Sequence, residues 1–238
     1  MSMPAPEEEG APLSSGTFVY LIAGIAHSIL GVDATVVRDI AQSLRSQGRM
    51  SPIYGAWAEI YAAHAEVMDA PPGPSGSTRA LEPVLARAEE AGRTLQAAGS
   101  GMGHAGQWLI RAQMSVRACL PEMGLTATEE ALAWIEQTGV RATEAEVWRT
   151  RGDLLLLADG PDESRHATAE ACFRRALEVA REQRARFLEL RAAVSLARLW
   201  REQGLCGEAR QLLAGIYGWF TEGFDTPDLQ AAKELLER

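Results

Sequence analysis

The chain has 238 residues, of which 47% are hydrophobic and 23% are charged, a composition typical of a globular protein of one or two domains. Its formal net charge is −9, and an acidic chain of this kind is not expected to bind nucleic acid, which favours basic surfaces. Lys233 is the only lysine, which excludes a phosphate-binding loop that ends in lysine, and the overall composition favours a cytoplasmic protein.

The N-terminal end carries two contrasting segments. Residues 1–16 are rich in proline, glutamate and glycine, and we expect them to form a disordered acidic tail. The apolar run FVYLIAGIAHSIL (18–30) is shorter than the ~20 residues that a membrane span needs, and His27 and Ser28 interrupt it. We therefore expect a buried helix there and no membrane span.

Helical periodicity continues through nearly the whole remaining chain, and the alternation typical of strands is almost absent. Ser51 and Pro52 are a typical cap and first residue of a helix, and the segment 70–78, rich in Pro, Gly and Ser, is the predicted linker loop. The connections are short, which predicts antiparallel neighbours. The expected helices are 17–30, 33–47, 51–69, 80–98, 105–118, 126–138, 142–158, 166–182, 185–203, 206–220 and 226–237.

The strongest internal signal lies in AAVSLARLWREQGLCGEARQLLAGIYG (192–218). This stretch resembles the tetratricopeptide repeat (TPR), a 34-residue helix-turn-helix motif, at its signature offsets. Gly204 falls in the turn, where a left-handed conformation is cheap only for glycine, and Ala197 and Ala209 are small where the two helices cross.

The preceding hairpin follows the same pattern with a longer turn. Trp148 and Gly152 fit the first helix of a repeat, and Phe173 fits the second between Ala169 and Ala176. Further upstream the match weakens, and Pro121 interrupts it. The predicted fold is all-α, a right-handed α-solenoid of about five TPR-like hairpins and a capping helix. Its predicted parts are the tail at 1–16, degenerate helical hairpins at 17–69, the linker loop at 70–78, degenerate TPR-like repeats at 79–140, two well-formed repeats at 141–223 and the capping helix at 224–238.

A wider resemblance covers residues 144–236. This part is similar to the C-terminal TPR region of large bacterial predicted ATPases that are often fused to adenylate or guanylate cyclase domains, and YGWFTEGFDTPDL (217–229) matches their recurrent terminal signature. The resemblance implies a sensing or docking role in bacterial signalling. It transfers no catalytic residue, because the catalytic modules of those proteins have no matching positions here.

The sequence offers little that would support catalysis. GMGHAG (101–106) matches a dinucleotide-binding fingerprint but follows a predicted helix rather than a strand, so a turn between helices is expected. The four histidines and three cysteines show no ligand spacing. We therefore expect no catalytic residue, metal or cofactor, and no enzyme.

A row of arginines is the main candidate for partner binding. Arginine captures carboxylates with paired hydrogen bonds, so a protein or peptide partner with acidic groups is expected in the concave groove of the solenoid. The competing interpretation is a solvated face in which the charges pair with one another. The predicted groove residues are Arg149, Asp153, Arg191, Val194, Arg198 and Arg201.

An alternative function is small-molecule sensing. Tyr54, Trp57 and Tyr61 share one helical face and, with Trp108, would line a pocket, although core packing explains the same spacing. Homodimerisation through the exposed ends of the solenoid is a further expectation.

Four aromatic residues gather near the C-terminus. Tyr217 and Phe220 continue the apolar stripe of the predicted helix 206–220. We expect Trp219 and Phe224 to wedge the final helix in place, so that the cluster closes the fold rather than forming a binding site.

Overall fold

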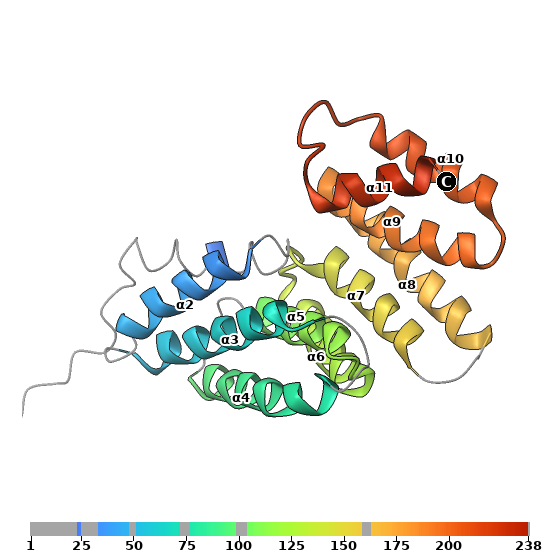
Figure 1. Cartoon of the computed structure of the whole chain (residues 1–238). Helices are drawn as coiled ribbons and strands as arrows, with labels where there is room; N and C mark the ends of the chain where they lie inside the picture. Colours follow the sequence, from blue (N-terminus) through green and yellow to red (C-terminus); the bar gives the residue numbers. More distant parts are fainter. Residues whose placement is uncertain are drawn as a thin grey trace, which may run out of the picture.

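The computed structural model describes residues 23–24, 33–47, 51–71, 77–98, 104–158 and 163–237. Within these ranges the chain is all-helical, which confirms the predicted all-α class (Figure 1). The predicted tail 1–16, most of the predicted helix 17–30 and residues 72–76 of the predicted linker lie outside the described residues. The helices are α2 (Ala34–Gln47), α3 (Pro52–Asp69), α4 (Ser77–Ala97), α5 (His104–Arg117), α6 (Pro121–Thr138), α7 (Glu144–Leu157), α8 (Glu163–Glu182), α9 (Arg186–Glu202), α10 (Cys206–Tyr217) and α11 (Pro227–Glu237).

The helices pack in chain order. Each described helix from α2 to α11 contacts the next one, and Figure 1 shows them following one another from α2 at one end of the molecule to α10 and α11 at the other. The odd-numbered helices α3, α5, α7, α9 and α11 also contact one another in succession. We call this row the odd-helix layer; the even-numbered helices pack mainly against their chain neighbours.

Local chemistry explains several helix ends. The Ser51 hydroxyl accepts a hydrogen bond from the Ile53 amide, and Pro52 follows at the first helical position. Gly204 has a φ of +84°, which confirms the predicted left-handed turn. The predicted helix 126–138 begins earlier than expected: Pro121 is the first residue of α6, a position with no intrahelical hydrogen bond for a proline to break.

Helix α7 approaches α8 closely at a glycine. A Cβ atom built on Gly152 would lie 2.4 Å from Cε1 of Phe173, so only glycine fits against this ring. Phe173 is fully buried, as are Ala197 and Ala209 in the next hairpin. The small residues that the sequence pattern singled out therefore lie where helices meet.

Two large hydrophobic clusters form the core of the described chain. One joins α2, α3, α4 and α5, and the other joins α8, α9, α10 and α11. Smaller clusters around α5, α6 and α7 lie between them. In the first cluster Arg117 of α5 holds the end of α3, donating hydrogen bonds of 2.7–2.8 Å to the carbonyl oxygens of Val67, Met68 and Ala70.

The C-terminal aromatic residues differ in their surroundings. Tyr217 and Phe220 are half-buried against the second large cluster, and the ring of Phe224, although 45% exposed, packs against Tyr217 with ring centroids 5.7 Å apart. The expected wedge is wrong for Trp219, which is 62% exposed. The reason is that α10 ends at Tyr217, so that Trp219 leaves the apolar stripe. The Arg186 guanidinium carbon lies 4.7 Å from the centroid of the Trp219 ring.

Candidate functional site

Helix α7 carries different chemistry on its two sides. Residues two apart in a helix point in nearly opposite directions, since each residue turns ~100°. Glu146 and Arg149 therefore face the neighbouring odd-numbered helices α5 and α9, while Trp148 and Arg151 face α6 and α8.

The side of α7 that faces α5 and α9 holds a network of polar groups from four helices, of which α7, α9 and α11 supply the charged ones. Glu146 is almost completely buried, and its Oε1 atom lies 2.6 Å from Nη2 of Arg149 and 3.1 Å from Nη2 of Arg191. The amide of Gln113 on α5 donates to the same oxygen at 3.1 Å. Arg149 also pairs with Asp153, and Nε of Arg191 lies 3.7 Å from Oδ1 of Asp228 on α11. We call Gln113, Glu146, Arg149, Asp153, Arg191 and Asp228 the charge network.

Burial and attraction compete in this charge network. Burial alone would raise the pKa of Glu146, but the adjacent Arg149 and Arg191 outweigh it and lower that pKa. Burial raises the pKa of Asp153 and of Asp228, and the neighbouring arginines only partly oppose this. The two arginines are thus already neutralised by carboxylates of the same chain.

The predicted groove residues separate into three groups in the structure. Arg149, Asp153 and Arg191 come together in the charge network. Val194 is buried, and Arg201 donates a 2.8 Å hydrogen bond to the carbonyl oxygen of Leu235 on α11. Arg198 is exposed and forms no ion pair with a described residue, although its charge acts on Asp228.

The four aromatic residues of the predicted small-molecule pocket do not share one cavity wall. Trp57 and Tyr61 are fully buried with ring centroids 5.3 Å apart, and Tyr54 packs against the same large cluster. Trp108 belongs to a different cluster, between α5, α6 and α7. None of the four lines the cavities described here, and their spacing follows from core packing.

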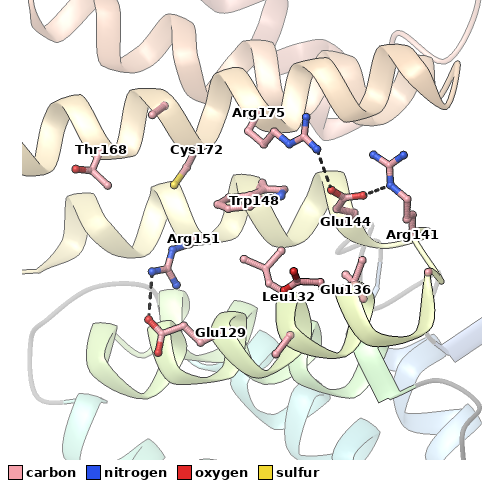
Figure 2. A pocket seen from close by; sticks show the side chains of 14 residues that line it. Glu129, Leu132, Glu136, Arg141, Glu144, Trp148, Arg151, Thr168, Cys172 and Arg175 are labelled. Carbon is pink, nitrogen blue, oxygen red and sulfur yellow. Dashed lines mark hydrogen bonds and ion pairs between the residues drawn. The ribbon is translucent and has the colours of Figure 1, made fainter.

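The other side of α7 opens into a groove of about 940 Å³ between α6 and α8, which we call the α7 groove (Figure 2). Trp148 lies in its middle, with Leu132 from α6 and the buried Cys172 from α8 beside it. Burial raises the pKa of the Cys172 thiol, an effect that nearby Arg151 partly opposes. The thiol is therefore kept neutral, and we assign it a packing role.

Charged residues border the α7 groove at both ends. At one end Arg151 lies 3.1 Å from Oε1 of Glu129. At the other, the buried Glu144 pairs with Arg141 and lies 3.5 Å from Nη2 of Arg175 (Figure 2). Hydrogen bonds to Glu144 and Glu182 raise the pKa of Arg141 above its ordinary value, so this guanidinium stays charged at any physiological pH.

Comparisons with known proteins identify no family. No protein-family model matches the sequence, and no curated protein is significantly similar to it. In the described part of the chain, no three His, Cys, Asp or Glu side chains are grouped so that they could hold a metal ion. None of the described helices is both long enough and apolar enough to cross a membrane.

Sequence reasoning missed two features of these sites. Gln113 and Asp228 join the charge network from α5 and α11, and only the relative rotation of the packed helices brings them to Glu146. The α7 groove was missed as well. Its one sequence signal is Trp148, which was interpreted only as a residue that fits the repeat pattern.

Proposed function

We propose that this chain is a non-catalytic helical-repeat scaffold, a TPR-type solenoid of about five hairpins closed by α11, that binds a peptide or protein segment. The succession of contacts within the odd-helix layer supports a solenoid, in which that layer would line the concave side. The resemblance of residues 144–236 to the TPR region of bacterial signalling ATPases supports a regulatory role for it in a bacterial cell.

One observation carries the binding proposal: charged side chains from three helices, α7, α9 and α11, come together in the charge network. Asp153 and Asp228 are about one-quarter exposed, and Arg198, whose charge acts on Asp228, is exposed and forms no ion pair with a described residue. Such a surface presents both signs of charge over several helices, which suits the polar groups of an extended segment. Arg198 is the residue that would receive an acidic group of that segment, because Arg149 and Arg191 are already paired.

The test is a selection of short random peptides on the immobilised wild-type protein. Arg198→Glu should weaken the selected peptides about tenfold or more, because it replaces the attracting charge with a repelling one. Arg210→Glu is the matched control, since Arg210 is an exposed arginine on α10. Thermal melting should be the same in both variants. Equal binding to wild type and Arg198→Glu, or no enriched peptide at all, would contradict the proposal.

A further inference from the structure

We propose that the α7 groove is a second binding site, separate from the odd-helix layer, and that it accepts an amphipathic helix of a partner protein. The groove is lined by α6, α7 and α8, and its lining residues on α7 run from Glu144 to Arg151. At 1.5 Å per residue, the stretch of α6 from Glu129 to Gly139 makes it ~15 Å long, enough for about ten residues of a helix.

In the neighbouring groove a side chain of the protein itself covers the corresponding tryptophan ring. Between α8, α9 and α10 the corresponding cavity measures about 350 Å³, compared with about 940 Å³ for the α7 groove. There the guanidinium of Arg174 covers the ring of Trp200, 5.1 Å from its centroid. In the α7 groove no described cation stacks on Trp148, and the groove stays wide around it.

The lining of the α7 groove suits an occupant that presents both an apolar surface and a hydrogen-bond acceptor. Trp148, Leu132 and Cys172 offer apolar contact area. The indole Nε1 of Trp148, however, is buried and has no hydrogen-bond partner. An unsatisfied buried donor costs about 1–3 kcal/mol, and a polar side chain of an occupant would recover it by displacing the side chains that cover this nitrogen. This combination is met by one face of an amphipathic segment.

The three helices that line the α7 groove offer few free backbone groups, which favours a helical occupant over an extended one. All three walls are helices, whose backbone groups are bonded within their own helix over most of their length. An extended peptide would find no sheet edge to pair with and would leave its own amides unsatisfied, whereas a helix satisfies them internally. Helix-in-groove binding is therefore the mode that this surface supports.

The borders of the α7 groove favour an occupant with basic side chains. The α6 side presents the exposed carboxylates of Glu129 and Glu136, and Glu136 forms no ion pair with a described residue. At the opposite end, carboxylates of the chain already pair with Arg141 and Arg175 (Figure 2). Basic side chains of the occupant would lie along α6 near Glu136, while a uniformly anionic ligand would be repelled by the carboxylates.

The experiment fills the α7 groove from a position that tolerates a large side chain. Ala171 of α8 lines the groove and is exposed, so Ala171→Trp should block the groove without disturbing the core. Ala167→Trp is the matched control, because Ala167 is exposed on the same helix and does not line the groove. The probe is a displayed library of helix-forming peptides of about 18 residues, with leucine at i, i+4 and i+7 and random Lys, Glu or Gln elsewhere.

We expect peptides selected on wild type to bind Ala171→Trp at least about tenfold more weakly and Ala167→Trp equally well. Binding should also move the indole N–H resonance of Trp148, assigned with Trp148→Phe, because that proton gains an acceptor. The proposal is overturned if no peptide is enriched relative to Ala171→Trp, or if the Trp148 resonance stays in place. Weaker binding to Arg198→Glu alone would also overturn it, since that result would place the peptides on the odd-helix layer.

Discussion

Lowering the pH from 7 to 5 should destabilise the first large cluster through a single buried histidine. His64 on α3 is 5% exposed, and its Nδ1 atom has no hydrogen-bond partner. Burial, and secondly the charge of Arg117, lower the pKa of His64 from 6.5 to about 4. The folded protein therefore holds this imidazole neutral at a pH where the unfolded chain protonates it.

The magnitude follows from the two pKa values. Because the folded pKa lies below the unfolded one, the contribution to stability is complete above pH 6.5 and is lost as the pH falls toward 4. A shift from 6.5 to about 4 corresponds to about 3 kcal/mol in total at ~1.4 kcal/mol per unit. About 2 kcal/mol of this is lost between pH 7 and pH 5, where most carboxylates stay ionised.

The assay is urea unfolding of wild type and of His64→Leu at several pH values between 7 and 5. Leucine keeps an apolar side chain in the site and cannot be protonated, so the free energy of unfolding of this variant should depend much less on pH. Effects of other groups, including Asp153 and Asp228 with their raised pKa values, are common to both proteins and cancel in the difference. Parallel pH profiles for the two proteins would refute the reasoning.

Two further predictions concern α7 and its surroundings. Gly152→Ala should destabilise the protein by about 1–3 kcal/mol, because the new methyl group overlaps the ring of Phe173 on α8. Gly215→Ala, in open space on α10, should instead stabilise the protein by up to ~1 kcal/mol. Equal shifts of the two variants in chemical unfolding would contradict this. Glu146→Ala should cost about 3–5 kcal/mol, because it leaves Arg149 and Arg191 without their shared carboxylate, and a melting temperature close to that of wild type would show that the charge network is not needed for stability.

Local features of this fold could be predicted from the sequence, because their causes lie within a few residues. The left-handed turn at Gly204 and the start of α3 at Pro52 are examples. The start of α6 shows the limit of such reasoning: the helix was predicted to begin at residue 126, but it begins at Pro121, because a proline can lie in a loop or at the first position of a helix.

The candidate sites depend on how distant helices are rotated against one another. Helical periodicity placed the arginines of the predicted groove on α7 and α9, but the pairing of Arg191 with Glu146 and Asp228 requires three helices in a specific orientation. The predicted burial of Trp219 was wrong for a related reason. Its burial depended on whether α10 continued past Tyr217, and the apolar pattern alone does not set that end.

The succession of helix contacts has a consequence for how this molecule unfolds. No substantial contact in the described chain joins helices more than two steps apart, and the two large clusters share no helix. Folding units that contact only their neighbours need not open together, so we expect the two large clusters to open locally with different free energies. Amide hydrogen exchange would separate the two openings. His64→Leu should change the protection of amides in α2–α5, and Gly215→Ala should change that of amides in α8–α11, with α7 at the boundary between the two responses.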